Sequence, residues 1–530
     1  MLRSSAFTVR TCTRQAVRNY SRSSAPRSAS VLPTPPQPSI PPQQQQGAPH
    51  AAAEDNLKPQ PFILRPLSKR YQLQTVSQPS HSSSTTLHFV SPAAPRQPRT
   101  LTLPNLFLRD ASIHPDHVHP SSKQRLFRTS DIPSEAKLVG YGVHDVPGHG
   151  ECLVTEWSTP LDTEAVPIQA RKLSVVPVDY LAGVMKGDQA HRDEEGNLPS
   201  ARPWDRAALV DSLKRTDYAA FKEDDAALRE TLDSLVRDGI VLLTGVPTQE
   251  KEGHHTELRS VVERIGSLRR TWYGDLWDVK AVEGSRNIAY TNLDLGLHMD
   301  LTHFDNPPRY QFLHSLENSH IRGGLSYFVD TFALAAHMHE HSPSAFQTLA
   351  SEPVQFSYRN GPHHTRFKRP TFELRPGSSS KLHAVNYSPP FQGNLPLTQL
   401  SRGADATVSD DAARLGELHD ALRQFAALCD GASVPGTDGA AEEKWRWEHQ
   451  LEPGECVVFD NRRVLHARTG FEFLADEAAK AGEKGETSSR WLKGAYMDGD
   501  EVWSKLRVLK AKQREELQGG GGKKGRTLFV

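Results

Sequence analysis

The stretch RNIAYTNLDLGLHMDLTHFDNPPR, residues 286–309, decides the fold and the chemistry that we expect of this chain. We predict that residues 289–301 are extended, and the side chains of an extended segment alternate between its two faces. His298 and Asp300 would then point to one side and Met299 to the other. One imidazole and one carboxylate on the same side are two of the three ligands of a facial Fe(II) site.

The third ligand is expected from a distant segment, because H-x-D triplets recur elsewhere in the chain and are weak evidence alone. The segment ECVVFDNRRVLHAR, residues 455–468, has the apolar, β-branched character of a buried strand and contains His466. His298, Asp300 and His466 would supply two imidazoles and one carboxylate to an Fe(II) ion. The other half of its coordination sphere would stay open for a co-substrate and oxygen.

The composition favours a globular enzyme over a nucleic-acid-binding or membrane-spanning protein. The chain has 530 residues, of which 37% are hydrophobic, and it carries 63 basic and 63 acidic residues. No run approaches eighteen consecutive apolar residues, so no membrane span is expected, and the balanced charge makes a nucleic-acid partner unexpected. The four cysteines are scattered, which indicates neither a disulfide framework nor a thiolate zinc site: Cys12, Cys152, Cys429 and Cys456.

The N-terminal residues are typical of a targeting segment. Residues 1–53 contain six arginines and no acidic residue, which resembles a mitochondrial transit peptide. We predict a transit peptide over residues 1–30, a location in the mitochondrial matrix, and a disordered Pro-, Ser- and Gln-rich leader over residues 31–84. The alternative is a basic disordered tail that carries no address.

The remaining chain is expected to form two domains and a tail. Short alternating runs between Pro and Gly turns predict a small β-rich domain over residues 85–182. Residues 183–510 would form the second domain, in which residues 224–236 have helical spacing and are followed by Gly239 and a buried strand at residues 240–245. Residues 412–428 also have helical spacing, and residues 511–530 are expected to be a flexible basic tail.

Six segments resemble the γ-butyrobetaine and trimethyllysine hydroxylases of the taurine-dioxygenase-like superfamily of Fe(II)/2-oxoglutarate enzymes. The resemblance implies a mainly β fold with flanking helices: a double-stranded β-helix, or jelly roll, behind a small β-rich N-terminal domain. It also implies Fe(II), 2-oxoglutarate as co-substrate, O2 and a homodimer. The segments are WYGDLWDV (272–279), NIAYTNLDLGLHMD (287–300), NPPRYQFLHS (306–315), GGLSYFVD (323–330), ECVVFDNRRVLHAR (455–468) and RWLKGAYMDGDEV (490–502).

The same resemblance implies the residues that bind 2-oxoglutarate. Arginine suits the far carboxylate of the co-substrate because its planar, charged guanidinium forms two parallel hydrogen bonds. By alignment this residue is Arg490, which follows a charged insertion after His466. Arg468 is the alternative, and Ser326 would add a hydroxyl contact.

A small trimethylammonium compound is the substrate that the resemblance implies, with γ-butyrobetaine preferred. A quaternary ammonium has no N–H to donate and is held by aromatic faces. Asn287 would bind the carboxylate of the substrate. The alternatives are trimethyllysine as substrate, or a mitochondrial protein that keeps the fold without turnover. The aromatic candidates are Tyr273, Trp277, Tyr290 and Tyr496.

Residues 108–117, LRDASIHPDH, resemble the zinc-binding run of the family's N-terminal domain, but serine and histidine stand where the family has cysteine. Without thiolates the tightest part of such a site is lost, so structural zinc is not expected. His114 and His117 are the remaining ligands in this run, and His119, His144 and His149 are conceivable additions.

Overall fold

The computed structural model describes residues 72–78, 82–91, 94–122, 124–146, 149–186, 198–250, 256–280, 295–318, 321–395, 408–431, 444–473 and 490–519. The expected transit peptide lies outside these residues, so the mitochondrial location stays a prediction, as does the homodimer. In the described part of the chain, no helix is both long and apolar enough to cross a membrane. The three cysteines in that part are buried and form no disulfide.

The N-terminal domain contains two three-stranded antiparallel sheets around one core, which contains Phe89, Leu153 and Trp157. Strands β1 (Gln72–Ser77), β2 (Ser84–Ser91) and β3 (Ala94–Pro104) form one sheet, and β4 (Leu138–Val146), β5 (Gly150–Trp157) and β6 (Leu173–Pro177) form the other. Two short helices and two 3-10 turns connect or follow these strands. They are α1 (Asn105–Asp110), α2 (Val178–Lys186), η1 (Pro115–His117) and η2 (Thr129–Asp131).

This domain begins earlier than residue 85, the boundary that we expected. Strand β1 pairs with β2 inside the range assigned to the disordered leader. Val76 is buried in the core of the domain, and Leu73 packs against that core. These two apolar side chains anchor the short strand to the domain. They were not recognised in the sequence because the surrounding residues are rich in Pro and Ser, a composition typical of disordered segments.

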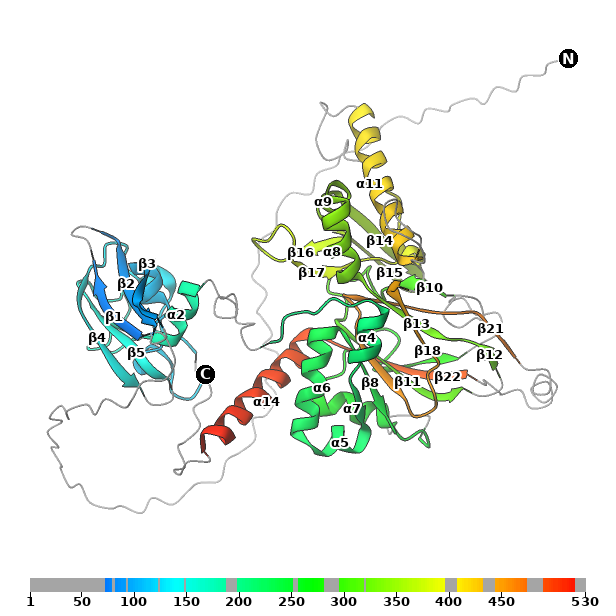
Figure 1. Cartoon of the computed structure of the whole chain (residues 1–530), viewed down its shortest axis with the longest axis horizontal. Coiled ribbons are helices and arrows are strands. Elements are labelled where there is room, and N and C mark those ends of the chain that lie inside the picture. Colours follow the sequence, from blue (N-terminus) through cyan, green and yellow to red (C-terminus); the bar gives the residue numbers. More distant parts are fainter. Residues whose placement is uncertain are drawn as a thin grey trace, which may run out of the picture. The chain divides into compact units, whose positions relative to one another are not determined.

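Two sheets form the jelly-roll framework of the catalytic domain, in agreement with the expected fold (Figure 1); their strands pair antiparallel except β7, which pairs with β8 in parallel. The larger has the order β7-β8-β19-β11-β22-β9 and the smaller the order β10-β20-β13-β18. The larger sheet comprises β7 (Arg215–Asp217), β8 (Ile240–Thr244), β9 (Leu276–Lys280), β11 (Tyr310–Asn318), β19 (Cys456–Asp460) and β22 (Arg490–Met497). The smaller comprises β10 (Leu295–His298), β13 (Ser326–Asp330), β18 (Arg446–His449) and β20 (Val464–Arg468).

Three two-stranded sheets extend this framework. They pair β12 (Ile321–Gly323) with β21 (Phe471–Phe473), β14 (Pro353–Asn360) with β15 (His363–Pro370), and β16 (Phe372–Leu374) with β17 (Leu382–Val385). The 3-10 turn η5 (Pro389–Phe391) follows β17.

Alternation along β8 shows how the layers are packed. Ile240 and Leu242 join Phe328 of the smaller sheet in a core between the two sheets. Val241 and Leu243 belong to a different core, which the larger sheet shares with helices. A strand buried on both faces reads as a continuous apolar run, which is why IVLLT was recognisable in the sequence.

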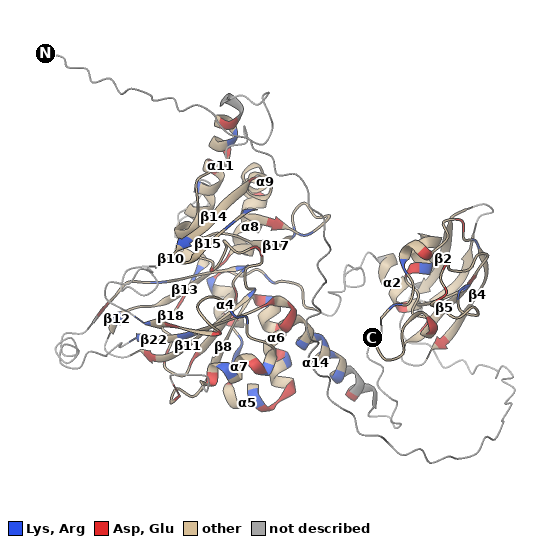
Figure 2. Ribbon diagram, turned by 180° about the vertical axis from the view of Figure 1, so that it is seen from behind, with Lys and Arg blue, Asp and Glu red and all other residues tan. Residues whose placement is uncertain are grey.

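Helices cover the outer face of each sheet (Figure 1). Four helices pack on the larger sheet: α5 (Tyr218–Glu223), α6 (Asp225–Asp238), α7 (Glu257–Ile265) and α14 (Gly499–Gly519). Three helices pack on the smaller sheet: α8 (Thr331–His341), α9 (Pro343–Ser351) and α11 (Val408–Cys429). Helix α4 (Arg206–Ser212) contributes Leu209 to the core between the two sheets. Figure 2 shows charges of both signs on α5, α6, α7 and α14, and Arg264 and Lys512 pair with Asp225 across these helices.

Local signals explain the helix ends. The carboxylate of Asp224 accepts a hydrogen bond from the N–H of Ala226 at the start of α6, and Gly239 ends this helix in the left-handed conformation at φ 77°. The expected helix, glycine turn and buried strand are therefore confirmed, as is the helix over residues 412–428. Helix α14 continues to Gly519, past the expected start of the tail, because residues 511–518 are mostly strong helix formers.

Candidate active site

Two neighbouring strands of the smaller sheet bring His298 and His466 together. His298 is the last residue of β10 and pairs directly with His466 of β20. The prediction of an extended chain as far as Leu301 was wrong: β10 ends at His298 and Asp300 lies in a turn. Leu301 has φ 57°, a left-handed backbone conformation that an L-residue adopts only under constraint. The turn, and not strand alternation, directs the carboxylate of Asp300 toward the histidines.

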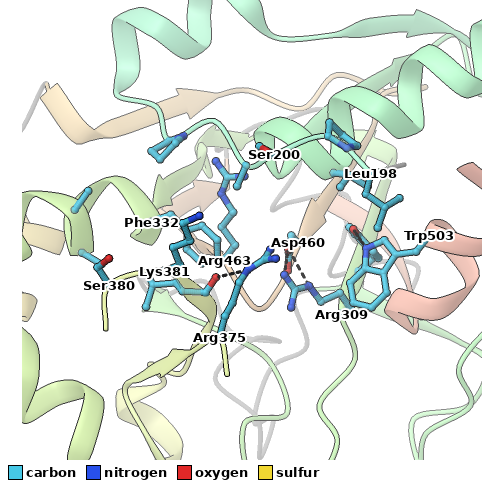
Figure 3. A pocket seen from close by; sticks show the side chains of 18 residues that line it. Leu198, Ser200, Arg309, Phe332, Arg375, Ser380, Lys381, Asp460, Arg463 and Trp503 are labelled. Carbon is cyan, nitrogen blue, oxygen red and sulfur yellow. Dashed lines mark hydrogen bonds and ion pairs between the residues drawn. The ribbon is translucent and has the colours of Figure 1, made fainter. Parts of the chain in front are cut away.

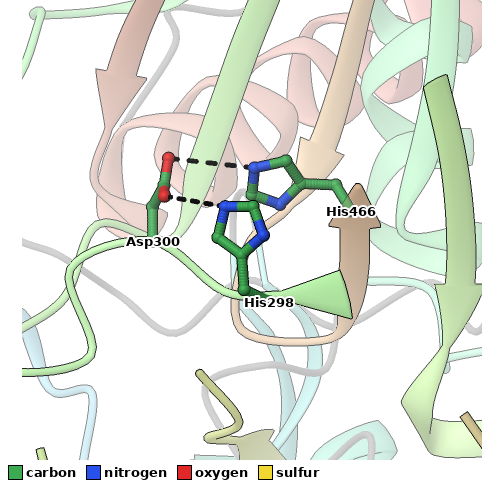
Figure 4. Close-up of side chains that lie close together, drawn as sticks. All are labelled: His298, Asp300 and His466. Carbon is green, nitrogen blue, oxygen red and sulfur yellow. Dashed lines mark ion pairs between the residues drawn. The ribbon is translucent and has the colours of Figure 1, made fainter. Parts of the chain in front are cut away.

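The three side chains converge on one point, as Figure 4 shows. Nε2 of His298 lies 3.4 Å from Oδ1 of Asp300, and Nε2 of His466 lies 3.9 Å from Oδ2. One ligand atom from each residue falls within 4.8 Å of the others. In the described part of the chain, this is the cluster of His, Cys, Asp and Glu that has the geometry to hold a metal ion.

The electrostatics of the cluster suit a divalent cation. Burial alone would raise the pKa of Asp300, but the hydrogen bond from His298 and the charges of both histidines hold this pKa well below its usual range. Burial, together with the nearby His298, lowers the pKa of His466 to about 3. The Asp300 carboxyl is therefore ionised and the His466 imidazole neutral near pH 7, which are the protonation states that bind a metal.

Neighbouring groups fix the orientation of the cluster. Nδ1 of His298 lies 2.8 Å from the carbonyl oxygen of Gly296 and donates to it, so that Nε2 is the ring nitrogen that faces Asp300 and the site. The hydroxyl of Tyr496 donates to Oδ2 of Asp300 at 2.8 Å. The side chain of Asn461 accepts from the N–H of Asp300 at 2.8 Å and donates to its carbonyl oxygen at 3.0 Å. Such contacts reduce the freedom of the ligands before any metal binds.

The comparison with known families agrees with this geometry. Residues 203–496, more than half of the chain, match the family described as "Taurine catabolism dioxygenase TauD, TfdA family". The chain belongs to the TauD/TfdA family. It is an Fe(II)- and 2-oxoglutarate-dependent dioxygenase, and His298, Asp300 and His466 are the residues that fit the iron.

Three relatives illustrate the range of similarity. "Dioxygenase str8" of Strobilurus tenacellus is 36% identical over 409 residues, covering 76% of this chain and 84% of that protein. "Gamma-butyrobetaine dioxygenase" of Pseudomonas sp. (strain AK-1) is 28% identical over 405 residues, covering 76% of this chain and 90% of that protein. "Trimethyllysine dioxygenase" of Meyerozyma guilliermondii is 24% identical over 420 residues, covering 76% of this chain and 90% of that protein.

Two buried arginines lie close together near the metal-binding residues of this TauD/TfdA-family site. Arg468 lies two residues beyond His466 on β20, so both side chains leave the same face of the strand. Arg490 opens β22, and both guanidinium groups lie over the ring of Phe471, with their carbons 4.9 and 5.9 Å from its centroid for Arg468 and Arg490. Burial, with the charge of Arg468, lowers the pKa of Arg490 to about 9. Two like charges held this close favour an anion beside them.

Ser326 is also placed at these arginines. It is buried on β13, directly opposite Arg468 in the strand register. The preceding Gly324 has φ 74°, and a Cβ there would come within 3.4 Å of Nε of Arg490. The Gly-Gly turn therefore lets the chain pass close to the arginine, and the structure brings together all three residues that the sequence suggested for 2-oxoglutarate.

Three of the predicted aromatic residues lie around Asp300. The ring of Trp277, on β9, has its centroid 5.1 Å from that of Tyr496, whose hydroxyl holds Asp300. Tyr273 interacts electrostatically with Asp300, and burial raises its pKa. Gly494 lies opposite Trp277 in the register, and a Cβ there would come within 2.4 Å of the indole. Asn287 and Tyr290 lie outside the described residues.

A stack of rings beside this group was not predicted. The ring of Trp272 is nearly parallel to those of His303, Tyr358 and His363, at centroid distances of 5.8, 5.5 and 4.7 Å. Tyr358 and His363 come from the β14–β15 hairpin, which the sequence analysis did not connect with the site. WY at residues 272–273 was visible in the sequence, but its partners are far away in the chain.

The histidines of the degenerate zinc run take part in the packing of the first domain. His117 is buried, and its Nε2 donates to the carbonyl oxygen of Ala170 at 3.0 Å. Burial lowers the pKa of His117 to about 4. Nδ1 of His114 accepts from the N–H of Asp116 at 3.1 Å. These contacts give both imidazoles a structural role, and the expectation about zinc stays a prediction.

Proposed function

We propose that this dioxygenase hydroxylates a small substrate with a trimethylammonium group, and that γ-butyrobetaine, which would yield carnitine, is this substrate. The observation that carries the proposal is the position of the Trp277 and Tyr496 rings. Tyr496 is bonded to the metal ligand Asp300, and Trp277 lies against it. A cation held by these faces would sit a short distance from the iron.

The chemistry of the cation explains this preference. A quaternary ammonium offers no hydrogen-bond donor, so it gains most from aromatic π faces that exclude water. Tyr273 would add a third face, and its half-buried position and electrostatic interaction with Asp300 support that role. Tyr290 as a fourth face and Asn287 as the carboxylate partner of the substrate stay predictions, since both lie outside the described residues.

The co-substrate would be held by the arginine pair. Arg490 would form two hydrogen bonds with the far carboxylate of 2-oxoglutarate, while Arg468 adds charge and Ser326 a hydroxyl contact. Bound Fe(II) supplies the redox chemistry that splits O2, so that one oxygen atom enters succinate, formed with loss of CO2, and the other enters a C–H bond of the substrate. The protein residues hold both reactants and keep water from the reacting groups.

Two of the three relatives support the proposed class of substrate. The proteins named for γ-butyrobetaine and trimethyllysine act on compounds with the same head group. The name of the 36% identical relative states no substrate. Trimethyllysine is therefore the second candidate, and an experiment must separate the two.

The test measures succinate formed by the full chain with Fe(II), 2-oxoglutarate and one added compound. We expect γ-butyrobetaine to raise succinate formation above the rate without substrate, and to do so more than trimethyllysine or taurine. The His298→Ala variant sets the background, because it lacks one iron ligand. Stimulation by trimethyllysine alone would move the proposal to the second candidate, and stimulation by taurine alone, or by none of the three, would reject it.

A binding measurement tests the role of the rings. Each desolvated aromatic face contributes about 1–2 kcal/mol, so Trp277→Ala should weaken γ-butyrobetaine binding about 5- to 30-fold. Trp277→Phe keeps an aromatic face and should lose less. Calorimetry under anaerobic conditions with Fe(II) and 2-oxoglutarate gives the Kd. Equal binding by wild type and Trp277→Ala would remove the aromatic argument.

A further inference from the structure

The segment before β9 forms a tight turn that carries two aromatic residues. The N–H of Gly274 donates to the carbonyl oxygen of Thr271 at 3.0 Å, and the N–H of Thr271 donates to the carbonyl oxygen of Gly274 at 3.1 Å. The N–H of Tyr273 donates to the hydroxyl of Thr271 at 3.2 Å. Gly274 has φ 99°, which glycine adopts without strain. Trp272 and Tyr273 are enclosed by these bonds, so a shift of one residue also moves the other.

The two side chains of this turn have different surroundings. Tyr273 interacts electrostatically with the iron ligand Asp300, and it is the third aromatic face proposed for the substrate. Trp272 extends into the ring stack, where its centroid lies 4.7 Å from that of His363 and 5.5 Å from that of Tyr358. The rings of Trp272 and Tyr273 are 6.0 Å apart and inclined by 55°. Trp272 therefore anchors the turn, while Tyr273 faces the site.

The β14–β15 hairpin presents the partners of Trp272 at its tip. Val354 and Phe356 of β14 are buried in the core that the smaller sheet shares with helices. Tyr358 lies on the same face of this strand, two residues further on. Asn360 pairs with His363, which places His363 at the tip of the hairpin. The core thus fixes the base of the hairpin, and the tip packs on the turn before β9.

A second contact connects the hairpin with the segment that follows Asp300. Nδ1 of His303 lies 2.7 Å from the hydroxyl of Thr365, which pairs with Tyr358 across the hairpin. His303 is buried, and its ring lies 5.3 Å from that of Tyr358 at an interplanar angle of 15°. The tip of the hairpin therefore contacts two segments beside the iron carboxylate, one on each side of Asp300 in the sequence.

We propose that Tyr358 and His363 are positioning residues for recognition of the substrate. Their rings pack against Trp272, and the turn that contains Trp272 then presents the face of Tyr273 to the trimethylammonium group. This inference rests on the proposed function, because it concerns binding of the same cation. It assigns a part in substrate recognition to a hairpin that contains none of the residues assigned to iron or 2-oxoglutarate.

Tyr273 sets the upper limit of the expected effect. Tyr273→Ala removes one aromatic face and should weaken γ-butyrobetaine binding about 5- to 30-fold. A residue that acts through Tyr273 loses only part of this contribution, so we expect Trp272→Ala, Tyr358→Ala and His363→Ala to weaken binding about three- to tenfold. The rings of Tyr358 and His363 are half-buried, so their removal leaves the buried core in place. Tyr358→Phe keeps the ring and should bind like the wild type.

Calorimetry with the full chain, Fe(II) and 2-oxoglutarate under anaerobic conditions measures these Kd values. Arg359→Ala is the control, because Arg359 is exposed and its side chain leaves the face of β14 opposite to Tyr358. The control should bind γ-butyrobetaine like the wild type. Fe(II) and 2-oxoglutarate should bind to Tyr358→Ala as they bind to the wild type. A parallel loss of Fe(II) affinity in Tyr358→Ala would show a general structural role and overturn the proposal.

A double-mutant cycle separates positioning from direct contact with the substrate. If Tyr358 acts through Trp272, Trp272→Ala/Tyr358→Ala should bind γ-butyrobetaine no more weakly than Trp272→Ala alone. Additive losses would overturn the proposal. A wild type that binds no γ-butyrobetaine would reject the proposed function and this inference with it. Wild-type binding that Tyr358→Ala and His363→Ala leave unchanged would overturn the inference alone.

Discussion

Replacing Tyr496 by phenylalanine removes one hydroxyl group from the iron site and leaves the aromatic ring in place. The hydroxyl donates to Oδ2 of Asp300 at 2.8 Å, and the side chain of Asp300 is 19% exposed. The variant should bind Fe(II) more weakly, because the carboxylate loses a fixed partner. The ring face proposed for the trimethylammonium group should be unaffected.

The size of the effect follows from the contact. A hydrogen bond to a charged group contributes about 1.5–3 kcal/mol. Loss of a group that supports a metal ligand lowers metal affinity about 10- to 100-fold, which corresponds to about 1.4–2.8 kcal/mol. The two ranges agree. Because Asp300 is partly exposed, water replaces the hydroxyl in part, and we expect a loss near the lower end, about tenfold.

An anaerobic Fe(II) titration against a competing chelator measures this affinity. Tyr310→Phe is the matched control, since Tyr310 is a buried tyrosine whose hydroxyl accepts from Nε1 of Trp503 at 3.2 Å. The control should bind Fe(II) like the wild type. Unchanged Fe(II) affinity in Tyr496→Phe, or the same loss in Tyr310→Phe, would refute the view that Tyr496 positions Asp300.

Three further predictions follow from contacts in the same domain. Arg490→Ala should raise the KM for 2-oxoglutarate about tenfold or more in steady-state kinetics, and a larger rise in Arg468→Ala would reverse the assignment. Asn461→Ala should lower the free energy of unfolding by about 2–4 kcal/mol in a denaturant titration, because buried backbone groups lose their partners; a loss below about 0.5 kcal/mol would contradict this. Gly494→Ala should weaken γ-butyrobetaine binding but not Fe(II) binding, because its Cβ would displace the indole of Trp277, and calorimetry with both ligands distinguishes the two.

The features that sequence reasoning found are those with local signals. Gly239 follows a helical period and precedes a run of four apolar residues, so a helix, a turn and a buried strand could be predicted, although the helix runs to Asp238 and the strand ends at Thr244. The iron ligands were recognisable because His298, Asp300 and His466 stand in motifs that resemble a known family. Their chemistry limits the choice, since few residue types bind Fe(II).

The features that it missed depend on contacts between distant segments. The direct pairing of His298 with His466 is set by sheet register, and no local pattern specifies it. The role of Asn461 depends on its position opposite Asp300 in the folded chain, although FDN was visible as a motif. The strand β1 was missed because a few apolar side chains within a polar, Pro-rich region carry little information until their partners are known.

The turn at residues 460–463 explains why the iron site is well defined although Asp300 lies outside a strand. Arg463 and Asp330 form an ion pair with side chains only 1% and 0% exposed, and Arg463 also donates to the carbonyl oxygens of Arg237 and Arg202. Loss of one member of such a pair destabilises a protein by about 3–5 kcal/mol, so this turn has one strongly preferred position.

Asn461, in the middle of this turn, connects the preferred position to the metal ligand. Its side chain holds the backbone of Asp300, and its own N–H donates to the carbonyl oxygen of Arg309 at 2.8 Å. Arg309 in turn pairs with Asp460, the first residue of the turn, at 2.8 Å (Figure 3). A substitution that shifted either residue would therefore act on the same backbone that places the iron carboxylate. The position of Asp300 therefore depends on a turn that two ion pairs hold in place.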